Sequence, residues 1–242
     1  YLYTNSLYNS WQANNIAGHV IPSGSDQMLG GAFAVWNDMI DKRQTGMSER
    51  DIYDRTIHAI PTMAQRLWGS ENQGDFATFE ENVEIIGKAP QTNLEAEIDT
   101  VDENIFVYDF ENDSVADKGK NGYDIVEQEN VTIEDEALVL NGGTSYVRNE
   151  LYETKRGTTL QFSVNRQEAA DGSEEILFES FNTQIKASIN GSGNFGFTRE
   201  GLDYESNYQL PIGEWVDIAL TSRLKVTDLY INGELIHTFT RN

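Results

Sequence analysis

The sequence of 242 residues contains no cysteine. This absence excludes disulfides, cysteine-ligated zinc and a thiol nucleophile. Basic residues are also scarce, because 17 Lys and Arg stand against 40 Asp and Glu and give a formal net charge of −23. A surface of that sign repels nucleic acid and anionic lipid, so neither is an expected partner. The longest apolar run, residues 28–36, is about half the roughly 20 residues that span a bilayer, so we expect no membrane insertion.

The residues that are present indicate a globular protein in two parts. Apolar residues make up 38% and aromatic residues 11% of the chain, whereas a disordered acidic tail would lack the aromatics. Residues 1–90 hold 11 acidic and 6 basic side chains, and residues 91–242 hold 29 and 11. Residues 89–103 are polar, acidic and opened by a proline, as is typical of a linker. We therefore expect one domain segment at 1–88 and a second domain at 104–242.

The first part has the pattern of one βα unit. Residues 28–36 are apolar without alternation, which predicts a strand buried on both faces, as in a parallel sheet. Ser48 and Asp51 have the spacing of a helix start. Apolar residues then recur at steps of three and four, which predicts an amphipathic helix kinked at Pro61. A further short helix is predicted at 75–87. One such unit cannot close a sheet by itself, so an α/β fold would need more strands.

The second part changes to the two-residue period of strands. Asn232 and Gly233 form the dipeptide that most strongly favours a type I′ hairpin turn. Many short alternating strands with almost no helix predict an antiparallel β-sandwich. The segments in which apolar and polar side chains alternate are residues 160–164, 185–189, 216–220 and 229–231.

Trp36 and Asp38 are candidate binding residues at the end of the predicted buried strand. Side chains two apart on a strand share a face, and α/β barrels place their active sites at the carboxyl ends of their strands. An indole offers a flat wall for the C–H face of a sugar, and a carboxylate accepts hydrogen bonds from its hydroxyls. The pair therefore suits a carbohydrate. The alternative is a core Trp36 with Asp38 capping the next turn, and the pair alone favours this alternative.

Residues 29–38 and 63–68 resemble the last strand and the last helix of the family 20 glycoside hydrolases, the β-N-acetylhexosaminidases. The strand carries the family's Gly-Gly followed by Trp, and the helix ends in Arg-Leu-Trp. The start of the chain, Tyr1 and Leu2, resembles the family's Tyr-Leu segment on the preceding strand. The resemblance implies that the first part is the C-terminal part of a (β/α)₈ TIM barrel.

The resemblance also implies three substrate-binding residues and a substrate, a glycan that carries N-acetylhexosamine. Trp36 would wall the sugar pocket. Asp38 would take the place of the family's glutamate at the 4- and 6-hydroxyls, and Tyr1 would hydrogen-bond the acetamido carbonyl. The sequence departs from the family at Asn37 and Asp38, where the family has Gly and Glu.

The catalytic pair of the family is not found in this sequence. The family's retaining mechanism is substrate-assisted and uses an adjacent Asp-Glu pair. The pairs Asp102-Glu103 and Asp135-Glu136 follow the predicted last helix and lack the family's lead-in, so we interpret both as solvated surface. We expect the catalytic pair and the rest of the barrel outside this chain, which alone should be inactive. The resemblance implies a bacterial protein that is secreted or attached to the cell surface.

Residues 104–242 resemble the concanavalin A-like, laminin G-type jelly rolls that are often appended to bacterial glycosidases. We therefore expect a TIM-barrel segment followed by a jelly-roll β-sandwich. The segments that carry this second resemblance are residues 106–110, 137–147, 213–219 and 229–234.

Two features of the second part have alternative interpretations. Tyr204 and Tyr208 are either a stacking platform for a sugar or packing residues. Asp109, Asp113 and Asp117 are either oxygen ligands for calcium or a solvated acidic turn, and no other cofactor is expected.

Three functions from different classes follow from these observations. The first is the C-terminal portion of a β-N-acetylhexosaminidase. The second is a carbohydrate-binding or adhesion module without catalytic activity. The third is a structural spacer that binds nothing.

Overall fold

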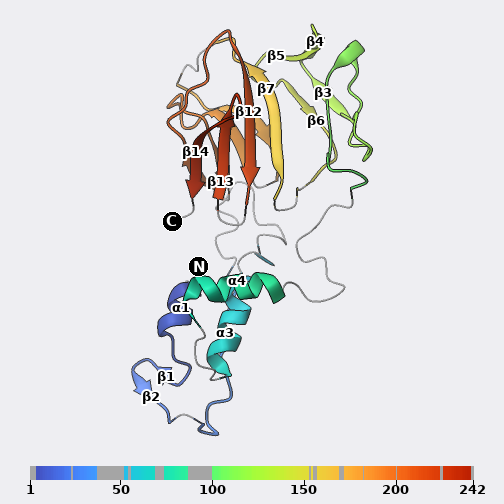
Figure 1. Ribbon diagram of the computed structural model, residues 1–242. Helices are drawn as coiled ribbons and strands as arrows, with labels where there is room; N and C mark the ends of the chain where they lie inside the picture. Colours follow the sequence, from blue (N-terminus) through green and yellow to red (C-terminus); the bar gives the residue numbers. More distant parts are fainter. Residues whose placement is uncertain are drawn as a thin grey trace. The chain divides into compact units, whose positions relative to one another are not determined.

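The computed structural model (Figure 1) describes most of the chain. The chain divides into two compact units, Tyr1–Glu95 with Asn165–Glu214 and Ala96–Val164 with Trp215–Asn242. No helix within the described ranges is long and apolar enough to cross a membrane. These ranges are residues 4–22, 24–36, 52–53, 56–68, 74–86, 100–152, 154, 157–168, 172–181, 183–199, 201–223 and 226–240.

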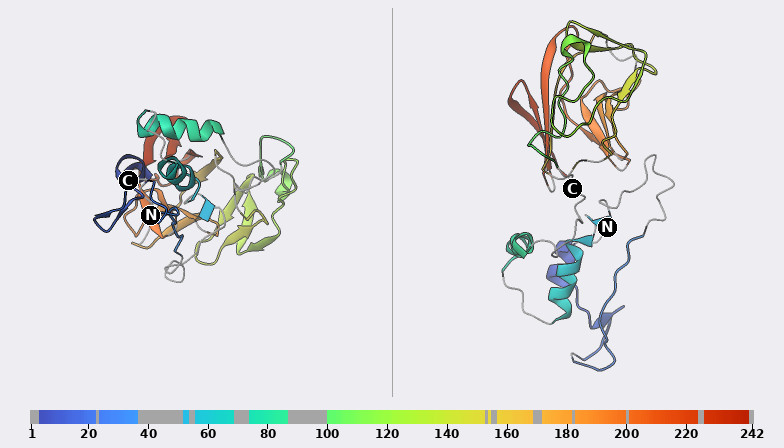
Figure 2. Two further views of the ribbon diagram at one scale, coloured as in Figure 1. Left: turned by 90° about the horizontal axis from the view of Figure 1, so that it is seen from below. Right: turned by 90° about the vertical axis from the view of Figure 1, so that its right-hand side faces the viewer.

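Three helices form a small cluster in the first unit. They are α1 (Thr4–Ser10), α3 (Ala59–Leu67) and α4 (Phe76–Ile86), and a short hairpin of β1 (Asn15–Ile16) and β2 (His19–Val20) follows α1. Figure 2 shows α1 beside α3. The ring of Tyr8, only 1% exposed, lies 4.7 Å from that of Phe79. Helix α4 confirms the helix predicted at 75–87.

The helical segment is interrupted before Pro61. Residues 52–53 and 56 are helical, and a turn at residues 57–58 separates them from α3, whose first residue is Ala59. Pro61 therefore lies in the first turn, where its missing N–H leaves no intrahelical hydrogen bond unmade. The predicted kink at Pro61 is thus a break, a turn between two helical segments with Pro61 at the start of the second, because starting a helix is less costly than continuing one through proline. The predicted start at Ser48 lies outside the described residues.

Residues 28–36 do not form the predicted buried strand. Leu29 is 97% exposed and Trp36 is 77% exposed, and within the described ranges no strand pairs with this segment. A strand buried on both faces needs a neighbour on each side, and the described residues supply neither. The segment does approach α3: a Cβ at Gly31 would lie 3.2 Å from Cε of Met63.

A four-stranded antiparallel sheet completes the first unit. Its order is β11-β10-β9-β8. Strand β9 confirms the strand predicted near 185–189. Asn190 and Gly191 form the turn after it, both with positive φ. A Cβ at Gly191 would lie 2.0 Å from the carbonyl oxygen of Gly172, so this position requires glycine. The strands are β8 (Glu175–Glu179), β9 (Thr183–Ser188), β10 (Gly196–Arg199) and β11 (Leu202–Glu205).

The second unit contains another four-stranded sheet, of order β14-β13-β12-β7. The alternation predicted for three of its strands is confirmed. Asn232 (φ 49°) and Gly233 (φ 82°) form the predicted turn between β13 and β14. One face of the sheet is apolar and buried, with Ile218 and Leu229 fully covered. The strands are β7 (Thr159–Asn165), β12 (Trp215–Ser222), β13 (Val226–Ile231) and β14 (Glu234–Thr240).

Two small two-stranded sheets and a loop region make up the rest of the second unit. One sheet pairs β3 (Glu127–Glu129) with β6 (Tyr146–Arg148), and the other pairs β4 (Val131–Glu134) with β5 (Ala137–Leu140). A 3₁₀ turn, η2 (Glu111–Asp113), lies in the loop region.

Candidate functional site

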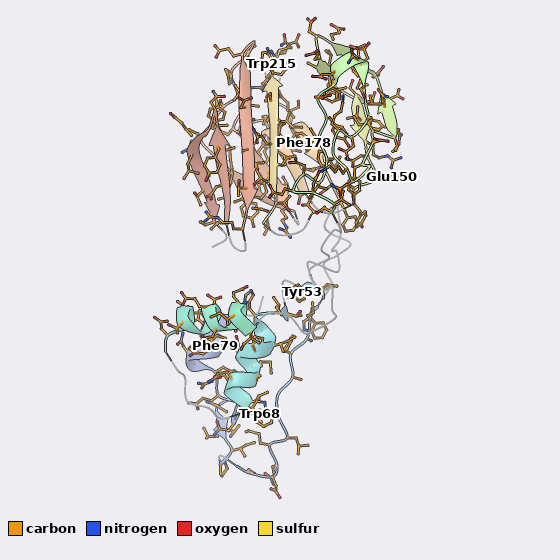
Figure 3. The ribbon with its side chains drawn as sticks, turned by 45° about the vertical axis from the view of Figure 1, so that its right-hand side comes forward. Tyr53, Trp68, Phe79, Glu150, Phe178 and Trp215 are labelled. Carbon is orange, nitrogen blue, oxygen red and sulfur yellow. The ribbon has the colours of Figure 1, made fainter. Side chains whose placement is uncertain are left out.

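Trp215 is a large aromatic side chain that the second unit leaves in solvent. It is 60% exposed, whereas the next residue of β12, Val216, is 4% exposed and Ile218 is fully buried. Alternate residues of a strand point to opposite faces, so Trp215 and Asp217 share the face opposite to the apolar one. Figure 3 shows Trp215 at the end of the sheet where β12 begins.

Hydrogen bonds hold Asp217 in place beside Trp215. The hydroxyl of Ser163, on the neighbouring strand β7, donates to Oδ1 of Asp217 at 2.5 Å. The backbone N–H of Asp217 donates to Oδ1 of Asn232 at 3.0 Å, and the N–H of Asn232 donates to the Asp217 carbonyl at 2.8 Å. Among the described residues, none binds the second carboxylate oxygen, Oδ2, which is therefore available to a ligand.

The same face continues across β13 and β14. Ala219 lies opposite Tyr230, and Tyr230 lies opposite Leu235, which is 55% exposed. We call this surface the Trp215 face. It combines an exposed indole, a second aromatic ring and a carboxylate with a free oxygen, and none of its described residues is basic. Its residues are Ser163, Trp215, Asp217, Ala219, Tyr230 and Leu235.

The chemistry of the Trp215 face suits the binding of a sugar. The flat indole can stack on the apolar C–H face of a sugar ring, and the free carboxylate oxygen accepts hydrogen bonds from hydroxyls. Strand β12 is central in its sheet, so both side chains stand on a rigid support. A preorganised surface loses little conformational entropy when a ligand binds.

The residues first considered for a sugar pocket are Tyr1, Trp36 and Asp38. Tyr1 and Asp38 lie outside the described residues. Trp36 is described and is 77% exposed, so the alternative of a core aromatic is wrong. Its role in a pocket stays a prediction.

Tyr204 and Tyr208 are both half-buried and lie in different surroundings. Tyr204 belongs to β11 and stacks on Phe197, with ring centroids 4.8 Å apart and planes 16° apart. The backbone carbonyl of Tyr208 accepts a hydrogen bond from the N–H of Phe195 at 2.7 Å. Burial, and then the charge of Glu214, raise the pKa of Tyr208 above its ordinary value. Tyr204 is thus a packing residue, not a loop residue as the sequence indicated.

The aspartates considered for calcium do not converge. Asp109 pairs with Lys118 at 3.6 Å. No group of three His, Cys, Asp or Glu side chains within the described ranges could hold a metal ion. Burial raises the pKa of Asp117, but hydrogen bonds from backbone N–H groups outweigh it and hold that pKa below its ordinary value. The N–H donors to Asp117 at known distance are those of Val107 (2.8 Å), Gly119 (2.8 Å) and Tyr123 (3.1 Å).

The Asp-Glu pairs lie on the surface, as predicted. Asp135 and Glu136 are exposed and form the turn between β4 and β5, with φ of 50° and 59°. Glu103 is exposed, and Asp102 lies 3.8 Å from Lys120.

The first unit has an open hollow of about 530 Å³. Arg166 lies against it and pairs with Glu175 at 2.7 Å. Its Nε is buried without a hydrogen-bond partner and is thus out of reach of a ligand in the hollow. The amide of Gln209 donates to Asn194 at 3.0 Å, so the polar groups here mainly hold loops together. The hollow is lined by Arg166, Gly191, Ser192, Gly193, Gln209, Leu210, Pro211 and Ile212.

Comparison with known families bears on the C-terminal part of the chain. Residues 141–242 match the Concanavalin A-like lectin/glucanases superfamily, in its laminin G type. The match includes both four-stranded sheets and confirms the laminin G-type jelly roll for this range. The described laminin G-like region is mostly β with few helices, as a sandwich of this superfamily should be. The family 20 resemblance of the first part stays a prediction.

Comparison with individual proteins covers curated proteins and solved structures. No curated protein matches the chain. Among solved structures, the chain is similar to domain 4 of AbnA, a GH43 extracellular arabinanase from Geobacillus stearothermophilus, solved in complex with arabinotriose. The two share 18% identity over 56% of this chain and 74% of that one, with a TM-score of 0.44.

The sequence analysis did not predict the Trp215 face, although the alternating pattern of residues 216–220 could have indicated it. The alternation at residues 216–220 correctly predicted a strand with Val216 and Ile218 buried. The same period places Trp215 and Asp217 together on the other face, with the spacing that singled out Trp36 and Asp38. What the sequence does not show is that Trp215 remains exposed, because this depends on how the rest of the unit folds.

Proposed function

We propose that the laminin G-like region is a non-catalytic carbohydrate-binding module that binds glycans on the Trp215 face. The observation that carries the proposal is the exposed indole of Trp215 beside a carboxylate with a free oxygen. The family match supports the proposal, because the superfamily is named after lectins and glucanases, which are carbohydrate-binding proteins. The module would work outside the cell, where such glycans occur.

The spacer hypothesis explains the Trp215 face less well. A side chain that serves only packing would be covered, since burying an indole stabilises a fold by about 2 to 3 kcal/mol. Trp215 forgoes most of that stabilisation because it is 60% exposed. Trp is also among the residue types that are enriched at the energetic centres of binding interfaces.

The test is glycan binding by wild-type protein and by Trp215→Ala, measured by calorimetry against a panel of soluble oligosaccharides. We expect the variant to bind its ligand at least about tenfold more weakly, which corresponds to about 1.4 kcal/mol. Its melting temperature should be nearly unchanged. Trp68→Ala is the matched control, because Trp68 is 86% exposed and lies in the other unit.

Two results would contradict the proposal. If the wild-type protein binds no glycan of the panel, the module is not a carbohydrate-binding one. If Trp215→Ala binds as tightly as Trp68→Ala, binding occurs elsewhere than on the Trp215 face.

A second proposal concerns residues 1–88, as part of a family 20 β-N-acetylhexosaminidase barrel. Its support is the sequence resemblance, together with the close approach of Gly31 to Met63 of α3. In this proposal Tyr1, Trp36 and Asp38 bind the terminal N-acetylhexosamine, and the catalytic pair comes from another part of the protein. The module would then hold such an enzyme near its substrate.

A further inference from the structure

Asp217 is a surface carboxylate with which no described Lys or Arg side chain of the second unit forms an ion pair. The carboxylate accepts one hydrogen bond, from the neutral hydroxyl of Ser163. The described Lys and Arg side chains of this unit are all paired with other carboxylates. These pairs are Lys118 with Asp109, Lys120 with Asp102, Arg148 with Glu127 and Arg223 with Asp228.

The surroundings of Asp217 increase the negative potential at the Trp215 face. Glu234 follows directly after the turn whose Asn232 is bonded to Asp217. The whole chain carries a net charge of −23. An anionic glycan would be repelled here and a cationic one attracted, both more strongly at low salt.

The indole beside Asp217 favours a cation for an independent reason. The face of a Trp ring attracts an ammonium group that lies within about 6 Å of the ring centre. Residues two apart on a strand have Cβ atoms about 6.6 Å apart, since each residue rises by about 3.3 Å. One ammonium group between the two side chains can therefore contact the indole of Trp215 and the free oxygen of Asp217 together.

We propose that the Trp215 face selects glycans whose sugars carry a free, protonated primary amine over the same glycans in N-acetylated form. The proposal rests on the proposed function, because it names the ligand class of the same face. Acetylation converts the ammonium to a neutral amide, which removes both the ion pair with Asp217 and the cation–π contact. The sugar rings can still stack on Trp215, so the acetylated glycan should bind, but more weakly.

The experiment compares two soluble oligosaccharides of equal length, one of glucosamine and one of N-acetylglucosamine. Affinities are measured by calorimetry with the full chain, at mildly acidic pH and low salt, where the amines are protonated. We expect the wild-type protein to bind the glucosamine oligomer at least tenfold more tightly. Asp217→Asn should reduce this preference to less than threefold, because affinity for the glucosamine oligomer should fall much more than affinity for the acetylated one.

Glu150→Gln is the control for general charge attraction. It removes the same charge from an exposed residue of the same unit, which Figure 3 shows well away from Trp215. This variant should keep the full preference. If it loses as much preference as Asp217→Asn, the attraction belongs to the whole chain and the proposal is wrong.

The remaining outcomes separate this inference from the function it rests on. Equal affinity for the two oligomers overturns the amine preference, and the carbohydrate-binding function stands. The same holds if other glycans bind through Trp215 and the glucosamine oligomer does not. If neither oligomer nor any other glycan binds, the proposed function fails and this inference fails with it.

Discussion

Replacing Asp117 tests whether one carboxylate organises the loop region of the second unit. Oδ1 of Asp117 accepts hydrogen bonds from the N–H groups of Val107 and Gly119, both at 2.8 Å. Oδ2 accepts one from the N–H of Tyr123 at 3.1 Å. The carboxylate thereby joins backbone segments on both sides of it. Asp117→Ala should leave all three donors without this partner.

The cost of Asp117→Ala follows from those three bonds. A hydrogen bond to a charged acceptor contributes about 1.5 to 3 kcal/mol when buried. The loop is half-buried, and solvent screening lowers this to about 1 kcal/mol per bond, or about 3 kcal/mol in all. Asp117→Asn keeps one acceptor oxygen, so it should lose about 1 kcal/mol. Glu103→Ala is the control, because it removes an exposed carboxylate from the same region.

The pH dependence gives a second measure of the same interaction. The pKa of Asp117 lies below its ordinary value of 3.8 in the folded protein. Its contribution to stability is therefore complete above that value and is lost as the pH falls through the folded-state pKa. The difference in unfolding free energy between wild type and Asp117→Ala should be constant near neutral pH and shrink at pH values below 3.8.

Two assays test the role of Asp117. They are denaturant unfolding as a function of pH and amide hydrogen exchange measured by NMR. The amides of Val107, Gly119 and Tyr123 should exchange faster in Asp117→Ala than in Glu103→Ala. A stability difference that stays constant through the acid range would refute the role given to the charge. Unchanged exchange at these three amides would refute the hydrogen-bonding role itself.

Two other predictions concern the turn glycines and the first part. Gly191→Ala should destabilise the protein far more than Gly233→Ala in thermal denaturation. Both glycines have positive φ, but only at Gly191 would a Cβ meet backbone, at 2.0 Å; the strain at Gly233 alone is about 1 to 2 kcal/mol. Equal melting temperatures of the two variants would contradict the steric clash expected at Gly191. On the proposal that residues 1–88 belong to a family 20 barrel, Asp38→Ala in the full-length protein should lower kcat/KM for an aryl N-acetylhexosaminide by about one to three orders of magnitude through lost hydrogen bonds to hydroxyls. Unchanged turnover would remove Asp38 from the pocket.

The strands of the laminin G-like region were predictable because their signal is local. Leu160, Phe162 and Val164 alternate with polar residues along β7, and this period is set by strand geometry alone. Asn232 and Gly233 likewise specify their turn through the positive φ that both adopt. Such features need no knowledge of the rest of the molecule.

Features that depend on distant partners were not predictable from the sequence. Helix α1, with the sequence TNSLYNS, has weak helical propensity, and it is anchored by the packing of Tyr8 on Phe79. Residues 28–36 have the apolar pattern of a buried strand. Whether they form one depends on neighbouring strands elsewhere in the protein, which the pattern of the segment itself does not reveal. The exposure of Trp215 is likewise a property of the folded unit and not of its own segment.

The position of Trp215 and Asp217 on a central strand has an evolutionary consequence. Both side chains point away from the buried face, so either residue can be exchanged at little cost in folding free energy. Their positions, in contrast, are fixed, because a slip of β12 by one residue would expose Val216 and Ile218 and bury the carboxylate. We therefore expect related domains to diversify their ligands by substitution at these two positions, while insertions and deletions are confined to the loops.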